Sequence, residues 1–209
     1  MTEAQAHPPV QPRRRTQRER REATVGKLVD ATIAAISDVG YAKASVQEIC
    51  GRAGVSHGGL FRHFETRLDL VVTAAQEVGR RQVANFLERT APFFSGGAEF
   101  VEVLRAIRAA SRAPLNIVWF ELLLAARTDD DLRARLAPTI EAYSADIYTT
   151  ALRIPAIAAQ PDDIRQVAVF TGLHLFDGET FVNAVYPRPD LDDRRLRFVA
   201  ACYESTIGG

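Results

Sequence analysis

The chain is poor in cysteine and has no long apolar run, and each absence excludes a class of protein. Its 209 residues contain only two cysteines, Cys50 and Cys202, which excludes a disulfide framework or a cysteine-rich zinc site and favours a reducing compartment. No stretch approaches the roughly 18 uninterrupted apolar residues of a membrane span. No apolar segment follows the basic N-terminus as it does in a signal peptide. We therefore expect a soluble, cytoplasmic protein.

The chain also has no net charge, but its charges are unevenly distributed. Residues 1–70 carry 11 Lys and Arg against 8 Asp and Glu, whereas residues 71–209 carry 15 against 18. A basic end joined to a slightly acidic remainder is typical of a protein that presents only one end to phosphate. Residues 1–17 contain prolines and Arg13–Arg15 and lack apolar periodicity, so they predict a flexible basic arm. The arm either enters a DNA minor groove or is a solvated tail.

No β-like alternation of useful length occurs, and apolar residues recur at helical spacing along most of the chain. This pattern predicts an all-α protein of about nine helices. The helix expected at 115–126 is apolar nearly all round, which predicts that it is buried. We expect three parts: the arm at 1–17, a small helical unit at 18–66, and a larger helical domain at 67–209.

Two short expected helices between residues 46 and 64 are joined by a glycine. Ser45 and Glu48 have the spacing of a capping box, and Ser56 is a second N-cap candidate. A helix-turn-helix needs inward apolar residues, a small residue at the crossing, a turn residue that tolerates positive φ, and apolar anchors. The residues that meet these needs are Ile49, Ala53, Cys50, Gly54, Val55 and Leu60. The sequence therefore predicts a helix-turn-helix, with an ordinary αα-corner as the alternative.

The stretch Val25–Leu70 resembles the DNA-binding domain of TetR-family repressors, above all in Ser45–Ile49 and Ala53–Arg67. Spacing and residue class agree over about 45 positions. Beyond residue 70 the resemblance is to helix count and order, although Trp119–Leu123 and Ala126–Asp129 resemble central helices of some members. The resemblance implies a DNA-binding repressor, with 18–66 as the helix-turn-helix DNA-binding domain and 67–209 as the ligand-sensing and dimerisation domain.

The resemblance assigns DNA-contact roles to particular residues. Ser45, Ser56 and Arg67 are expected to contact phosphates. The segment His57–Gly59 is expected to open the recognition helix, whose N-terminal end enters the major groove. Phe61 stands where the family usually has tyrosine, so it is expected to contact sugar or pack. Arg62 is expected at phosphate or guanine, and His63 at the DNA backbone. The full set is Ser45, Ser56, His57, Gly58, Gly59, Phe61, Arg62, His63 and Arg67.

A single short recognition helix reads only a few base pairs, so we expect a homodimer on a palindromic operator. The last two long helices, at about 162–186 and 190–206, are the expected interface, arranged as a four-helix bundle with those of the second copy. Its candidate apolar residues, some of which must face the subunit's own core, are Phe170, Leu173, Phe181, Leu196, Val199 and Tyr203.

Nearly all aromatic residues lie in 71–209, and a helical domain of this size can hold an apolar pocket with a few polar groups. We expect a small, largely apolar effector that shifts the population between two geometries, with plain core packing as the alternative for each residue. We expect the effector to release the protein from DNA, with promotion of DNA binding left open as the alternative. The candidates are Phe86, Phe100, Leu104, Trp119, Leu123, Tyr143, Ile147, Phe170, His174 and Asp177.

Two other functions compete with this hypothesis. The four histidines form no metal-binding or triad-like motif, and His174 with Asp177 would supply too few ligands for a metal. We therefore predict no enzyme, no catalytic residue, no metal and no cofactor. A constitutive DNA-binding protein without a ligand is the other alternative, but it needs a broadly basic surface, whereas residues 71–209 are net acidic.

Overall fold

The computed structural model describes residues 16–205, and every regular element in that range is a helix, which confirms the all-α prediction. The expected arm, with Arg13–Arg15, lies almost entirely outside the described residues and stays a prediction. Two short 3-10 turns, Ala91–Phe93 and Pro189–Leu191, connect longer elements. The α-helices are α1 (Gln17–Val39), α2 (Val46–Ala53), α3 (His57–Phe61), α4 (Arg67–Thr90), α5 (Phe100–Ser111), α6 (Asn116–Ala126), α7 (Asp130–Ala151), α8 (Pro155–Ala158), α9 (Asp162–Asn183) and α10 (Asp192–Ser205).

These ten α-helices of the described range exceed the expected nine by one, α8. Pro155 occupies the first turn of α8, where its missing N–H costs nothing. A single turn is too short to show apolar periodicity, so the sequence pattern could not reveal it.

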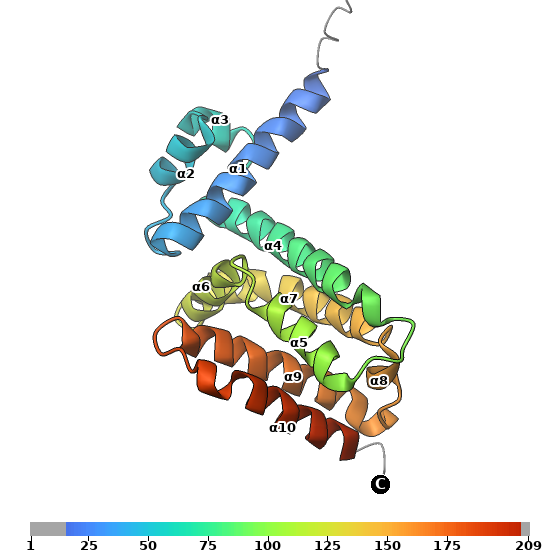
Figure 1. Cartoon of the computed structure of the whole chain (residues 1–209). Helices are drawn as coiled ribbons and strands as arrows, with labels where there is room; N and C mark the ends of the chain where they lie inside the picture. Colours follow the sequence, from blue (N-terminus) through green and yellow to red (C-terminus); the bar gives the residue numbers. More distant parts are fainter. Residues whose placement is uncertain (1–15, 206–209) are drawn as a thin grey trace, which may run out of the picture.

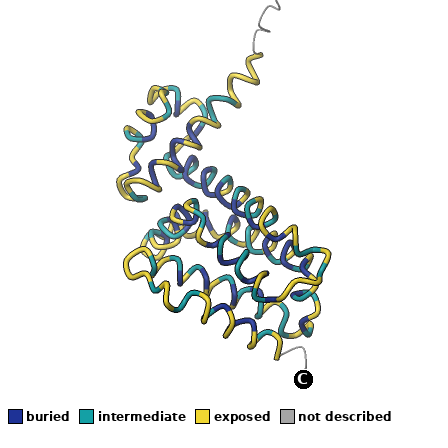
Figure 2. Tube along the Cα trace, in the orientation of Figure 1, coloured by how far each residue is buried: buried dark blue, intermediate teal, exposed yellow. Residues whose placement is uncertain are grey.

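Helices α1 to α3 form a small unit at one end of the molecule, and α4 leads from this unit into the bundle formed by α5 to α10 (Figure 1). The pair α9 and α10 forms the outer layer on the side away from α1–α3 (Figure 1). Buried residues follow α4 along most of its length, because its apolar positions recur every three or four residues (Figure 2). None of the helices among residues 16–205 combines the length and apolarity needed to cross a bilayer.

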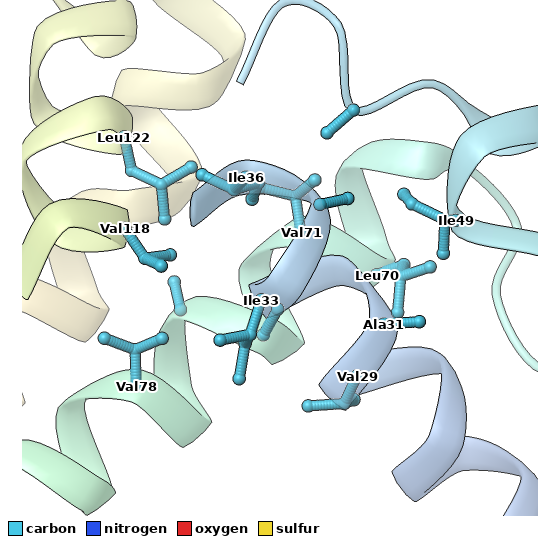
Figure 3. Packing of buried hydrophobic residues seen from close by; sticks show 14 of the residues in the cluster. Val29, Ala31, Ile33, Ile36, Ile49, Leu70, Val71, Val78, Val118 and Leu122 are labelled. Carbon is cyan, nitrogen blue, oxygen red and sulfur yellow. The ribbon is translucent and has the colours of Figure 1, made fainter. Parts of the chain in front are cut away.

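The hydrophobic core consists of two clusters that meet along α4. The first joins α1 and α2 to α6 and α7, and Ile36, Val71 and Leu122 all belong to it (Figure 3). The second lies in the distal half of the bundle and contains Phe86 and Phe176. Because the first cluster extends across residue 66, the unit of α1–α3 and α6 share one core. The domain division at residues 66 and 67 stays a prediction.

The expectation that the helix at 115–126 is fully buried is wrong. Val118 and Leu122 are buried, but Ile117 and Leu124 on the opposite face of α6 are 39% and 53% exposed. A helix that is apolar all round gives no signal of which face packs, so the sequence could not show that α6 lies at an edge of the single chain. Leu123, a candidate pocket residue, is also exposed at 38%.

Polar contacts add to the shared core between the two ends. The Glu121 carboxylate on α6 accepts the Tyr41 backbone N–H at 3.2 Å, just after α1 ends. Arg135 of α7 pairs with Asp69 at the start of α4. Glu121 thus connects α6 to the segment that precedes α2, and Arg135 connects α7 to the start of α4.

Candidate nucleic-acid interface

Helix α2 is held by an N-cap that the sequence predicted and by an ion pair to α1 that it did not. The Ser45 Oγ accepts the Glu48 backbone N–H at 3.2 Å, which confirms Ser45 as the N-cap. The expected capping box is only half formed. The Glu48 carboxylate accepts from Arg52 at 2.7 Å instead of returning to the cap, and Arg52 also reaches Asp38 of α1 at 2.5 Å. The Arg52–Asp38 pair joins α2 to the end of α1, and the Arg52–Glu48 pair lies within α2.

The turn after α2 has the geometry the sequence predicts. Gly54 adopts φ 63° and ψ 33°, in the left-handed region that favours glycine. The N–H groups of Gly54 and Val55 both donate to the Cys50 carbonyl, which ends α2. Ile49, Cys50 and Leu60 are buried around this bend. The predicted helix-turn-helix is confirmed.

Helix α3 is shorter than expected, because it ends at Phe61 and not at Phe64. Ser56 is its N-cap, with Oγ accepting the Gly59 N–H at 3.1 Å. Gly58 and Gly59 weaken this five-residue helix. Phe64 is buried, and the residues between Phe61 and Phe64 form a turn. Arg62 and His63 therefore lie in that turn and not on the helix.

The residues of α3 divide clearly into buried and exposed sides. Leu60 is fully buried, whereas Phe61 is 50% exposed, and His57, Gly58 and Arg62 are also exposed. An exposed aromatic next to an exposed arginine can contact sugar and phosphate. The short helix thus presents polar atoms and backbone outward while its one apolar anchor faces the core.

The two adjacent glycines have different surroundings. A Cβ on Gly59 would come within 2.8 Å of the Val55 Cγ1 and 3.2 Å of the Ser56 Oγ. A Cβ on Gly58 would meet nothing within 4 Å. Gly59 is therefore required by packing within the turn, and only Gly58 is free to serve a close approach from outside.

Arg67 makes internal contacts that the sequence did not predict. Its Nε donates to the Ala44 carbonyl at 2.7 Å and its Nη2 to the Tyr41 carbonyl at 2.5 Å. Its guanidinium lies 4.5 Å from the centre of the Tyr41 ring. Two of its three nitrogens hold the segment before α2, so positioning that segment is its first role.

Sequence reasoning missed Thr66, which caps α4. Its Oγ1 accepts the Asp69 N–H at 3.1 Å, and the Asp69 carboxylate accepts the Thr66 N–H at 2.7 Å. Thr66 and Asp69 have the spacing of a capping box, and this signal was available in the sequence. The exposed Thr66 hydroxyl and the exposed Lys43, just before Ser45, join the candidate DNA-contact residues.

The predicted effector residues do not all gather in one place. Phe86, Phe100, Leu104 and Ile147 line a closed apolar cavity of about 20 Å³, room for about one water molecule. Trp119 belongs to the first core cluster, and Tyr143, with its ring centre 4.9 Å from that of Trp119, packs against both clusters.

Of the remaining candidates, Leu123 and His174 are exposed and do not line the cavity. The Phe170 ring is half-buried between Tyr148 and His174. Asp177 is half-buried, and burial raises its pKa to about 6. The distal cavity thus contains four of the ten predicted residues.

The structure also sorts the candidate residues of the last two long helices. Leu196 and Val199 are buried in the subunit's own core, and Leu173 and Tyr203 are half-buried against it. Phe181, by contrast, is 57% exposed. We define the α9–α10 face by its exposed apolar side chains, which are Val167, Leu175, Phe181, Val182, Val185, Tyr186 and Phe198.

Comparisons with known proteins agree with this geometry. The family model described as bacterial regulatory proteins, tetR family, matches residues 28–74. An uncharacterized HTH-type transcriptional regulator of Mycobacterium tuberculosis is 39% identical over 187 residues, which are 90% of this chain and 96% of the relative. CymR, an HTH-type transcriptional regulator of Pseudomonas putida, is 41% identical over 63 residues, which are 30% of this chain and 31% of CymR.

Solved structures show the same fold. A protein from Rhodococcus sp. assigned to the TetR-family regulators matches with a TM-score of 0.68 at 20% identity, over 89% of this chain and 99% of that one. The multidrug binding protein EbrR, crystallised with imidazole, matches with a TM-score of 0.65 at 20% identity, over 86% of this chain and 93% of EbrR.

Proposed function

This chain belongs to the tetR family of bacterial regulatory proteins, as its sequence resemblance predicted, and from that premise we propose that it is a repressor that binds a palindromic operator as a homodimer and is released by a small molecule. The family assignment establishes a helix-turn-helix transcription regulator and not an enzyme. Operator symmetry, repression and release are the parts we propose.

The observation that carries the proposal is the exposure of α3 on a rigid bend. Leu60 anchors the helix in the core, and Gly54 sets the angle at which it leaves α2. His57 and Gly58 are thereby left at the outer surface, at the N-terminal end that enters a major groove in this motif. We propose that His57 and Arg62 read base edges and that the Gly58 backbone approaches the duplex closely.

Phosphate contacts would position the recognition helix. The exposed N-caps Ser45 and Ser56 stand at helix N-termini, where hydroxyls and positive dipole ends favour anions. Phe61 would pack on sugar, since it has no hydroxyl to bond phosphate. Two Arg67 nitrogens hold the segment before α2, which leaves Nη1 for a phosphate.

His63 would bond the DNA backbone through Nε2. Its Nδ1 is buried and has no hydrogen-bond partner among the described residues. The neutral ring therefore carries its hydrogen on Nε2, because a buried N–H without an acceptor is costly.

The proposed dimer uses the α9–α10 face. The outer layer formed by α9 and α10 contains many exposed residues (Figure 2). The exposed apolar side chains of the α9–α10 face are the surface that a second copy would cover. Phe181 also packs its edge against Phe120 of α6, with ring centres 6.1 Å apart, so the α9–α10 face continues onto α6. Two copies joined there would present two α3 helices to successive turns of a palindrome.

The proposed effector site lies in the distal half of the bundle, where the apolar cavity is. A ligand that requires a wider cavity would favour a different arrangement of α4 to α7 and would lower operator affinity by that preference, typically about 1–3 kcal/mol. Glu121 and the shared core supply the connection to the segment before α2.

Selection of DNA from a random pool by the full chain tests the proposal. We expect an enriched palindrome, bound as two copies per site, with affinity that falls steeply as salt rises. In the Arg62→Ala variant, affinity for the enriched site is expected to fall by about tenfold or more, whereas Arg89→Ala, an exposed arginine on α4, is the matched control. Enrichment of no sequence, or of an asymmetric site bound by one copy, would contradict the proposal.

A further inference from the structure

Each of four helices that line the distal cavity has, on its cavity-facing side, a polar residue one turn away from an apolar lining residue. On each helix the apolar residue lines the cavity and the polar residue stands four positions away, on the same face. The pairs are Phe86 and Gln82 on α4, Ile107 and Ser111 on α5, Ile147 and Tyr143 on α7, and Leu173 and Asp177 on α9.

The four polar residues lie at one end of the cavity. On α4 and α7 the polar residue precedes its apolar partner, whereas on α5 and α9 it follows. Helices α4 and α7 run away from the DNA-binding end, and α5 and α9 run back toward it (Figure 1). On each helix the polar residue therefore stands on the same side of its apolar partner in space, and this is the side on which α6 lies. We call Gln82, Ser111, Tyr143 and Asp177 the polar layer.

The polar layer contains a hydrogen-bond acceptor that nothing in the described chain satisfies. Gln82 is 6% exposed; its amide donates to the Asn116 side chain, and the Asn116 amide donates to the Ser111 carbonyl. The Gln82 Oε1 is buried without a partner. A buried acceptor of this kind costs free energy unless some other group bonds it.

The polar layer also contains a carboxylate that no arginine or lysine of the described range neutralises. Asp177 accepts a hydrogen bond from Ser111 and has one basic neighbour, His174 on the same helix, whose charge opposes the effect of burial on the Asp177 pKa; no ion pair to Asp177 occurs among residues 16–205. Glu179, two residues later on the same helix, is held by Arg112 at 2.9 Å and Arg195 at 2.8 Å. The chain therefore neutralises the acid outside the polar layer and leaves the one inside it unpaired.

We propose that the polar layer binds the head group of an amphipathic organic cation whose apolar part enters the distal cavity. The ammonium group donates to the Asp177 carboxylate and to the Gln82 Oε1, the two acceptors left open. An anionic head group is disfavoured, because it would face the Asp177 carboxylate, to which no ion pair is made among the described residues. The cavity has room for about one water molecule, so the apolar part of the ligand must widen it. This widening is the proposed difference between the effector-bound state and the DNA-binding state.

This inference deepens the proposed effector role, and its test is independent of DNA. Titration calorimetry on the full chain compares octylammonium, octanol and octanoate, which share one apolar chain and differ in head group. We expect octylammonium to bind at least about tenfold more tightly than octanol, and octanoate to bind most weakly. Equal affinity of the three probes, tighter binding of octanoate, or no binding of octylammonium would overturn the proposal.

Two variants locate the binding site. Asp177→Asn keeps the shape and the Ser111 contact but removes the charge, so it is expected to lose the preference for octylammonium while binding octanol as before. Asp163→Asn removes an exposed acid from the same helix and is expected to change neither affinity. Gln82→Met, checked for folding by its melting temperature, is expected to weaken octylammonium several-fold. An unchanged preference in Asp177→Asn would place the cation elsewhere and overturn the assignment.

Discussion

The two glycines of α3 differ in what a methyl group would meet. Gly59→Ala would force a Cβ within 2.8 Å of Val55, so we expect the free energy of unfolding to fall by about 1–3 kcal/mol. Gly58→Ala meets open space and is expected to stabilise the protein by up to about 1 kcal/mol. Urea unfolding of both variants measures the difference. Gly58→Ala should nevertheless weaken binding to the selected operator, and unchanged affinity would remove the proposed close approach of its backbone.

Asp177 makes stability depend on pH. Burial raises its pKa from 3.8 to about 6. An acid with a higher pKa in the folded state binds protons on folding, so its contribution to stability falls as pH rises from about 4 to 6. Asp177→Asn avoids this loss and is expected to be more stable than the parent above pH 6, by up to about 3 kcal/mol, and equally stable below pH 4. Urea unfolding across that range tests this, and a difference that does not vary with pH would contradict it.

At the scale of elements, the contact between α6 and the turn after α1 can be removed by one substitution. Glu121→Ala leaves the Tyr41 N–H without its acceptor, so we expect the free energy of unfolding to fall by about 1–3 kcal/mol and the Tyr41 amide to exchange faster. Glu141→Ala, an exposed carboxylate on α7, is the control. Equal exchange at Tyr41 in parent and variant would show that the contact does not hold the turn.

Helix boundaries set by local chemistry were predictable from the sequence, whereas those set by packing were not. Ser45 and Ser56 predict the starts of α2 and α3 as N-caps, and Gly54 predicts the turn because it tolerates positive φ. The structure confirms each of these roles. The end of α3 at Phe61 depends on burial of Phe64, a tertiary effect. The exposed side of α6 was likewise hidden, because all its faces are apolar.

The candidate DNA-contact residues were predictable from the resemblance, but the contacts of Arg67 were not. Its carbonyl partners at Ala44 and Tyr41 are 23 and 26 residues away in the sequence, and no local pattern indicates them. Of the predicted effector residues, the four that line the distal cavity lie together in the second core cluster. Trp119 and Tyr143 pack nearer the DNA-binding end, and composition cannot distinguish these two places.

At the scale of the whole molecule, assembly through the α9–α10 face makes a specific prediction. Val185 and Phe198 are 89% and 71% exposed, so replacing both by glutamate should leave the single chain folded and destroy the interface. We expect sedimentation equilibrium to show a monomer with unchanged helical content and operator affinity at least about a hundredfold weaker. Ala134→Glu on α7 is the control. A variant that remains a dimer would place the interface elsewhere.

Cleavage of the selected operator from beside α3 tests the central claim most directly. An iron chelate attached to Glu65→Cys, with the exposed Cys202 replaced by serine, would cut DNA near the recognition helix. The account predicts two clusters of cuts related by the operator's symmetry, about 10 base pairs apart or a multiple of that, and none from a chelate on Asp163→Cys. No cutting from Glu65→Cys, or a single cluster, would contradict it.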